Sequence, residues 1–463
     1  MPDRAAVGDR VGDADLVLRP VIHAGRTWWT PLRVLLAVTA VTFALGMVQK
    51  AGCYSKTWEN SEGRYVQMCY SDLPYLYTGR GLAELDWPYS DDAQTRSRYE
   101  VMEYPVGIAY WAWGAAWVTH WLKGSPPMEP RHEAATDQLW SMPAVHAEIG
   151  PYVAVNALGF AILALAATWL LVLSRRGPRG SPWDVLWFAA SPMLLVTGLV
   201  NWDLLAVTCV AAAIFAWSRG RPGWAGVAIG LGTAMKLYPL FLLGAIVILA
   251  WRARRWPAVG LAFLGAGLSW LLVNAPAMLG GWDEWKVFWS FNSSRGADLG
   301  SLWLVAQQVT GHTFTPHTIN VWSWLLFGLW CALTLAVGLA ARRTPTFAEL
   351  GFVVVAGFLI VNKVYSPQYV LWLLPLAVIA RPRWREQAWW QGAEFAYFAL
   401  VWWYLGGFLA PGGGDQQPFY WLGILVRVAG ELWLVGRIVH GWFPRVGSAR
   451  DPERAADLAS SPS

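Results

Sequence analysis

The sequence predicts an all-α polytopic membrane protein, a bundle of about 12 transmembrane helices with large outer loops. Of its 463 residues 56% are hydrophobic and only 14% are charged, and 34 are Trp. This composition is typical of membrane proteins and not of soluble domains. The net charge of +5 comes mostly from short Arg-rich clusters between apolar runs. Such clusters report membrane topology, so we expect no nucleic-acid partner.

The Arg-rich clusters also predict the orientation of the chain. They are SRRGPRG (174–180), SRGRPG (218–223), WRARRW (251–256), ARRTP (341–345) and RPRWRE (381–386). The positive-inside rule assigns them to the cytoplasm. With roughly 20 residues per span, fewer in short hairpins, we expect spans near 32–49, 149–173, 183–200, 203–218, 222–236, 238–251, 257–273, 319–340, 347–362, 367–380, 388–409 and 418–438. Both termini are then cytoplasmic, as expected for a multi-pass plasma-membrane protein.

One further apolar stretch, 105–123, is long enough to cross, but a crossing there would put every later Arg-rich loop outside. We therefore expect an interfacial or re-entrant helix on the outer face, which its four Trp also suit. The acidic segment 124–148 then lies outside as well.

The domain organisation follows from this topology. We expect one membrane domain over 32–442, with outer loops at about 50–148 and 274–318. The polar, non-periodic ends 1–31 and 443–463 are predicted to be disordered cytoplasmic tails. No apolar signal segment precedes residue 32, so the first span is predicted to be a signal anchor.

The cysteines divide between two environments. Cys209 and Cys331 lie in predicted spans, where a free thiol behaves as a small hydrophobe. Cys53 and Cys69 lie in the first outer loop, on the oxidising side. We expect them to form a disulfide that holds the loop carrying Asp72.

Nearly all the polar segments that interrupt the apolar runs belong to an ordered set of short motifs on the outer side. They are SDLPYLYTGRGL (71–82), WPY (87–89), EYP (103–105), NWD (201–203), NSSR (292–295) with SLW (301–303), and NKVYSPQY (362–369). In this order they resemble the glycosyltransferases of family 87, in the GT-C superfamily of membrane enzymes. The family form of the third motif carries a second Pro where this chain has Val106.

The resemblance implies a fold and a reaction. It implies a GT-C-like membrane bundle that takes a single sugar from a polyprenyl-phosphate donor on the outer face. The acceptor would be a hydroxyl of a lipid-linked molecule or a polysaccharide. Mannose is the expected sugar, with arabinofuranose the nearest alternative. The chain carries no Gly-rich phosphate loop and no Rossmann-like strand pattern, so we expect no nucleotide site and no cofactor.

The reaction requires a base and a cationic site. An acceptor hydroxyl is a weak nucleophile, so a carboxylate must take its proton. Asp72 is the predicted base and Glu103 the alternative. Around Asp72 we expect sugar-stacking or acceptor contacts from Tyr75, Tyr77, Trp87 and Tyr89.

The departing phosphate needs cations and hydrogen-bond donors. Arg295 is the first candidate because its planar fork can bind a phosphate through two bonds. Lys236 and Lys363 are further candidates, although each could instead extend to the lipid headgroups. Ser366 and Gln368 would add neutral donors.

Other polar residues are assigned less specific roles. Asn201, Asn292 and Trp303 are predicted sugar or acceptor contacts. Asp203 either faces the site or caps the next helix. His312 and His317 supply only two ligands from one loop, which is too few for a zinc site, so no metal is predicted.

A second functional class remains open. Twelve spans with both ends inside is also a common arrangement for a transporter or a lipid flippase. The large outer loops and the absence of paired half-length repeats favour the enzyme. The position of the main cavity separates the two classes, because a carrier needs it at mid-membrane.

Overall fold

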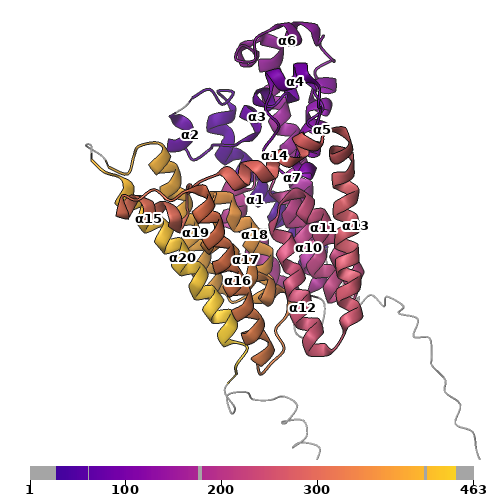
Figure 1. Cartoon of the computed structure of the whole chain (residues 1–463), viewed down its shortest axis with the longest axis vertical. Helices are drawn as coiled ribbons and strands as arrows, with labels where there is room; N and C mark the ends of the chain where they lie inside the picture. Colours follow the sequence, from indigo (N-terminus) through magenta and orange to yellow (C-terminus); the bar gives the residue numbers. More distant parts are fainter. Residues whose placement is uncertain (1–27, 61, 176–179, 411–413, 445–463) are drawn as a thin grey trace, which may run out of the picture.

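The computed structural model describes residues 28–60, 62–175, 180–410 and 414–444. In that part of the chain every regular element is helical: twenty α-helices and five short 3-10 helices, and no strand (Figure 1). The all-α prediction is confirmed. The predicted tails lie almost entirely outside the described residues.

Four of the described helices are long and apolar enough to cross a membrane on their own. They are α1 (Pro31–Tyr54), α7 (Pro143–Ser174), α13 (Trp256–Gly280) and α16 (Pro316–Ala340). Shorter or more polar helices complete the bundle: α10 (Leu204–Ser218), α11 (Pro222–Met235), η4 (Tyr238–Phe241) with α12 (Leu242–Ala253), α17 (Phe347–Val361), η5 (Pro367–Tyr369) with α18 (Val370–Ala380), α19 (Trp384–Leu405) and α20 (Gln417–His440). These helices coincide with eleven of the predicted spans.

The predicted span 183–200 is not one helix. It is divided into η3 (Pro182–Val185), α8 (Leu186–Ala189) and α9 (Pro192–Thr197). Pro192 removes a backbone donor, and the Ser191 hydroxyl accepts from the amides of Met193 and Leu194, so a new helix begins there. Ser191 also donates to Gln391 of α19, which fixes the break inside the bundle.

Close helix packing in the bundle depends on small residues. A Cβ added at Gly226 of α11 would lie 2.0 Å from the carbonyl oxygen of Ala262 of α13, and one at Gly230 would lie 2.1 Å from that of Ala266. The two backbones therefore touch along a glycine stripe, a contact typical of membrane helices. Any larger side chain at these two positions would force α11 and α13 apart.

The segments predicted to be outer loops form a compact cap on one end of the bundle. It contains α2 (Gly63–Val66), α3 (Leu73–Gly79), η1 (Leu82–Glu84), α4 (Ala93–Arg98), α5 (Val106–Leu122), α6 (Glu129–Glu133), η2 (Leu139–Ser141), α14 (Trp282–Ser294) and α15 (Leu302–Thr310). A buried ion pair anchors part of it: Arg131 donates to both carboxylate oxygens of Glu148 at 2.7 and 2.9 Å. Because Glu148 belongs to α7, the cap is fastened to a membrane helix.

Helix α5 stands along the N-terminal half of α7 and does not lie flat. Trp111 donates to Asn156 at 3.2 Å, and His120 lies 3.4 Å from Glu148, so the two helices are antiparallel. From its first residue α5 therefore runs away from the Arg-rich end of the bundle. This placement agrees with a helix that does not cross.

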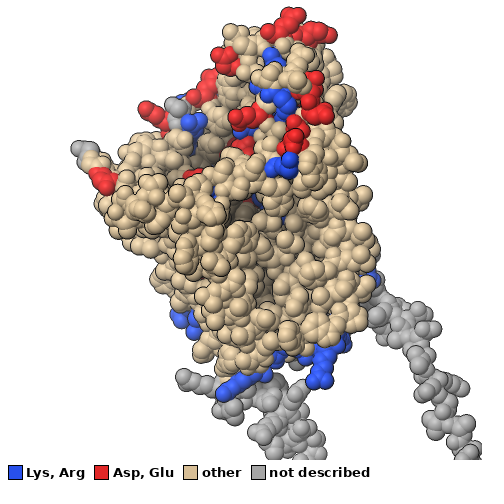
Figure 2. All heavy atoms as spheres, in the orientation of Figure 1, with Lys and Arg blue, Asp and Glu red and all other residues tan. Residues whose placement is uncertain are grey.

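Charge is divided between the two ends of the molecule. Figure 2 shows Lys and Arg without Asp or Glu at the lower end, whereas the cap at the upper end carries most of the Asp and Glu together with some Lys and Arg. The Arg-rich loops lie together there, since Arg219 donates to Leu173 O, Arg252 to Gly338 O and Arg343 to Gly441 O. We refer to these as the basic end and the cap end.

Candidate functional site

The main cavity in the described part of the chain has a volume of about 720 Å³. It lies at the cap end: α11 and α17 begin beside Arg-rich loops and finish at its wall with Lys236 and Lys363. Figure 2 shows hollows beside the position of α14, with basic atoms visible inside. The predicted site residues that line it are Asp72, Glu103, Asn201, Lys236, Asn292, Arg295, Lys363, Ser366 and Gln368.

Asp72 is fixed in place by its backbone. Its amide donates to Val200 O at 2.8 Å, and the Ser71 hydroxyl donates to the same carbonyl at 3.2 Å. The next residues, Leu73 and Pro74, begin α3, so Asp72 stands at the N-cap with its side chain free of the helix. The outer loop is thereby pinned to the segment between α9 and α10.

The Asp72 carboxylate faces the cavity and accepts a hydrogen bond of 2.8 Å from the Tyr104 hydroxyl. Enclosure by protein raises the pKa of Asp72 above its usual value, although the hydrogen bond from Tyr104 and the charge of Lys236 oppose that rise. A carboxylate with a raised pKa is a stronger base. This is the property that general base catalysis requires.

Lys236 reaches the same region from the end of α11. Its Nζ lies 2.9 Å from Asp203 Oδ1 and 4.6 Å from the centre of the Tyr104 ring. Trp372 donates to the other Asp203 oxygen at 3.1 Å. Asp203 is fully buried and makes no side-chain cap, so its role in the structure is to hold Lys236 at the cavity wall.

Glu103 also lines the cavity, but it is already paired. Arg80 donates to Glu103 Oε2 through Nε at 3.0 Å and Nη2 at 2.9 Å. The Glu103 carboxylate is thus occupied by a cation, whereas the Asp72 carboxylate is held by the neutral Tyr104 hydroxyl. The contacts therefore favour Asp72 over Glu103 as the base.

Arg295 and Lys363 form the cationic wall. Arg295 follows α14 and is oriented by Asp298, whose Oδ2 accepts a hydrogen bond from Nε at 2.7 Å and lies 2.5 Å from Nη2. Lys363 Nζ donates to Asn292 O and to Asn320 Oδ1. Burial and the neighbouring Arg295 lower the pKa of Lys363. Two cations this close favour an anionic ligand.

A buried network supports this wall from behind. Arg427 of α20 pairs with Glu431 at 2.9 Å and donates to Gly300 O at 3.1 Å. Tyr365 donates to Glu394 at 2.8 Å, and its amide donates to Leu299 O at 2.8 Å. The network fixes the loop after Arg295 and the loop after Lys363 relative to each other.

An aromatic wall adjoins the cationic one. It is formed by Phe288 and Phe291 of α14, Trp324 and Phe327 of α16, and Phe358 of α17. The ring centres of Phe327 and Phe358 lie 5.4 Å apart, and the Trp324 side chain in α16 is 52% exposed. The cavity is therefore amphipathic and is bordered by apolar, exposed helix surface.

The other predicted contacts do not line this cavity. Tyr77 is fully buried and donates to Glu148 at 2.7 Å. Trp87 and Tyr89 pack against Tyr110 with ring centres 5.2 and 6.0 Å away. Trp303 donates to Ser323 Oγ and to Val361 O, each at 3.0 Å. Tyr75 stacks between Tyr70 and Trp140. In the structure these side chains support the cap and the wall.

Sequence reasoning missed several lining residues: Tyr65, Tyr70, Tyr104, Asn320, Tyr369, Trp372 and Trp402. Tyr70 directly precedes the motif that contains Asp72, and Tyr104 follows Glu103 within its motif, so proximity in sequence could have identified both. Trp402 lies in an apolar helix with no local signal.

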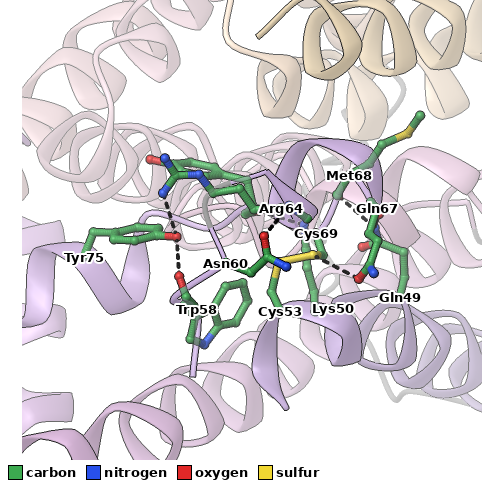
Figure 3. The surroundings of a disulfide bond; sticks show 12 residues. Gln49, Lys50, Cys53, Trp58, Asn60, Arg64, Gln67, Met68, Cys69 and Tyr75 are labelled. Atoms are coloured by element: carbon green, nitrogen blue, oxygen red, sulfur yellow. Dashed lines mark hydrogen bonds between the residues drawn. A yellow bond between two sulfur atoms is a disulfide. The ribbon is translucent and has the colours of Figure 1, made fainter. Parts of the chain in front are cut away.

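The predicted disulfide is present. Cys53 and Cys69 are bonded, with Cα atoms 5.8 Å apart (Figure 3). Gln49 donates to Met68 O at 2.8 Å and Lys50 to Tyr70 O at 2.9 Å, so the far end of the loop is held against α1. The disulfide and these hydrogen bonds place Tyr70 and Asp72 at the cavity wall.

No cluster of three or more His, Cys, Asp or Glu side chains that could hold a metal occurs in the described ranges. His312 packs against Phe314 with ring centres 5.0 Å apart, and neither His312 nor His317 lines the cavity.

Comparison with known proteins gives one family. Residues 141–367, just under half of the chain, match the model of glycosyltransferase family 87. This segment contains Asn201, Lys236, Arg295 and Lys363 but not Asp72. No curated protein matches the chain.

Proposed function

Because this chain resembles the glycosyltransferases of family 87, we propose that it transfers a single sugar, with mannose the expected one, from a polyprenyl phosphate to an acceptor hydroxyl. The reaction would occur on the outer face of the plasma membrane, with both termini cytoplasmic. The acceptor would be a lipid-linked molecule or a polysaccharide.

One observation carries the proposal. A single cavity brings together a carboxylate with a raised pKa, a cationic wall and an aromatic wall. A polyprenyl-phosphate sugar has the matching parts, namely a hydroxylated ring, an anionic phosphate and an apolar chain. The phosphate would lie against Arg295 and Lys363, and the chain would leave past Trp324 and Phe327.

The residues then have distinct roles in one displacement. Asp72 takes the proton of the acceptor hydroxyl while that oxygen bonds to the anomeric carbon. The bond from this carbon to the phosphate oxygen breaks, and the polyprenyl phosphate leaves with the electron pair. Tyr104 orients the Asp72 carboxylate, and Arg295, Lys363 and Lys236 stabilise the charge on the departing phosphate.

Attack from the face opposite the phosphate inverts the anomeric centre, with no covalent sugar on the protein. The position of the cavity also supports an enzyme over a transporter or flippase. It is lined by outer-loop residues at the cap end, such as Asp72 and Arg295, and a carrier would need it at the middle of the bundle.

The direct test is to incubate the purified protein with labelled polyprenyl-phosphate sugars, including mannose and arabinofuranose, and a lipid-linked acceptor extract. We expect label from the mannose donor in the product, and no label with Asp72→Asn. Transfer from the arabinofuranose donor alone would change the sugar. Absence of transfer from every donor would contradict the proposal.

A further inference from the structure

One part of the cavity wall has no role in the displacement described above. It is formed by the disulfide-closed loop, which contributes Tyr65 and Tyr70, and by the end of α19, which contributes Trp402 and Leu405. α2 packs against α19 at this place: a Cβ added at Gly406 would lie 3.0 Å from the Cβ of Tyr65.

The wall is a continuous aromatic array. The ring centre of Tyr70 lies 5.2 Å from Trp402 and 5.6 Å from Tyr75, and Tyr65 lies 6.2 Å from Trp402. Arg64 lies over this array, with its guanidinium carbon 4.9 Å from the ring centre of Tyr65. Rigid rings with polar edges give a large binding surface that loses little conformational entropy on binding.

Trp402 adds a hydrogen-bond donor that no described group of the protein uses. Its side chain is 4% exposed, and its indole Nε1 has no hydrogen-bond partner in the structure. A buried donor without a partner costs stability unless something else accepts from it. Trp402 lines the cavity but its Nε1 is covered by neighbouring atoms, so a ligand that shifts those neighbours can supply the acceptor atom.

The charge on this wall indicates the class of ligand. The cavity-lining cations Lys236, Arg295 and Lys363 belong to other segments, while this wall offers phenol and indole groups. Arg64 is not among the lining residues, and its Nη1 donates to Tyr75 at 3.0 Å. Neutral donors and aromatic surface suit an uncharged, hydroxyl-rich group and not an anion.

The wall also belongs to a different part of the chain from the cations. Tyr70 is two residues before Asp72 and is held by Lys50, whereas Arg295 and Lys363 follow α14 and α17. An inverting displacement requires the nucleophile to arrive opposite the phosphate. We therefore assign the Tyr70 wall, and not the wall that carries the cations, to the hydroxyl that meets Asp72.

We propose that Tyr65, Tyr70 and Trp402 form the acceptor subsite and bind an uncharged glycan whose hydroxyl is delivered to Asp72. This proposal rests on the proposed function and adds the class of acceptor and its place. The disulfide loop would thus be part of substrate recognition.

The test measures glycan and phosphate binding separately on the full-length protein in lipid nanodiscs. The first probes are soluble trisaccharides of mannose, glucose and galactose, whose binding is measured by saturation-transfer NMR. The second probe is a polyprenyl phosphate. Trp402→Phe keeps the ring and removes the N–H, so trisaccharide affinity should fall about threefold to tenfold, the effect of one neutral hydrogen bond. Tyr65→Leu should also weaken it.

The matched control is Trp389→Phe on the same helix, because Trp389 is 74% exposed and does not line the cavity. It should leave both affinities unchanged. Unchanged polyprenyl-phosphate affinity in Trp402→Phe shows that the variant is folded. Two outcomes would show that the acceptor subsite is wrong while leaving the proposed function in place. In the first, polyprenyl phosphate binds but no trisaccharide does. In the second, Trp402→Phe and Tyr65→Leu bind trisaccharide like the wild type. If polyprenyl phosphate does not bind the wild type, both proposals fail.

Discussion

At the scale of single residues, Asp72 has the sharpest predicted phenotype. Asp72→Asn keeps the size of the side chain and its contact with Tyr104 but removes the basic group. Turnover should fall by at least about 100-fold, the usual contribution of a general base, while polyprenyl-phosphate affinity changes little.

The comparison variant is Glu103→Gln, which disturbs the pair with Arg80. Radiolabel transfer and donor binding are measured for both. A dead Glu103→Gln together with an active Asp72→Asn would assign the base to Glu103, and activity in both would contradict the inverting mechanism.

The pH dependence of turnover should report the environment of Asp72. A base works only when ionised, and burial raises the pKa of Asp72, so kcat/KM should decline at a higher pH than an ordinary carboxyl group would give. Tyr104→Phe removes a hydrogen bond that lowers this pKa, and the acid limb should move further up in pH. Rate profiles of the two proteins test this, and an acid limb that moves down would contradict it.

Arg295 should not be replaceable by lysine. Its guanidinium is oriented by Asp298 and can offer the phosphate paired N–H donors, which a point ammonium cannot. Arg295→Lys should lose about 10-fold to 100-fold in kcat/KM, the range for hydrogen bonds to charged groups. Steady-state kinetics against donor concentration measure this. Normal kinetics in Arg295→Ala would exclude the role, and a loss confined to Lys236 or Lys363 variants would move it there.

At the scale of elements, the disulfide loop is the part of the site that depends most on a covalent constraint. The bond joins residues 16 apart, and closing a loop of this length contributes about 3 kcal/mol in the chain-entropy model. The double variant Cys53→Ser, Cys69→Ser should therefore lower the thermal stability and loosen Tyr70 and Asp72. Turnover should fall more than polyprenyl-phosphate affinity.

The measurements are thermal unfolding and the two affinities, with Cys331→Ser as a control that removes a free thiol. Mass spectrometry of an unreduced digest checks the bond itself. Two free thiols in the native protein, or a double variant with normal stability and turnover, would contradict this role.

At the scale of the whole molecule, the division of charge predicts which end is accessible from outside. Ser125 lies after α5 in the cap and Ser218 at the end of α10 beside the Arg-rich loops, and both are exposed. In a protein with Cys209→Ala and Cys331→Ala, Ser125→Cys should react with an impermeant thiol reagent in intact cells and Ser218→Cys should not. The reverse pattern would invert the topology.

Most helices of the bundle could be predicted because an apolar run or an Arg-rich loop is a local pattern, visible within one segment of the sequence. The prediction failed at 183–200, where a continuous apolar run is broken by Pro192 and by the contact of Ser191 with Gln391 of α19. That contact joins residues 200 apart in the sequence, which no local pattern reveals.

The candidate site was predicted to a similar degree. Asp72, Arg295 and Lys363 could be proposed because polar groups between apolar runs are costly without a role. The same reasoning cannot distinguish an aromatic ring that lines a cavity from one packed behind it. Tyr77 and Trp402 illustrate this, since both are buried, yet only Trp402 lines the cavity.

The length of α7 gives the molecule a fixed height. Its 32 residues extend about 48 Å, whereas a bilayer core is only about 30 Å thick. The upper part of α7 carries Glu148 and hence the cap, so the distance from the basic end to the cavity is set by a single helix. The headgroup level, in contrast, is set by the lipids. A thicker bilayer would therefore submerge the aromatic wall of the cavity and a thinner one would lift it clear. If the donor is lipid-bound, as proposed, hydrophobic mismatch would change how readily it enters.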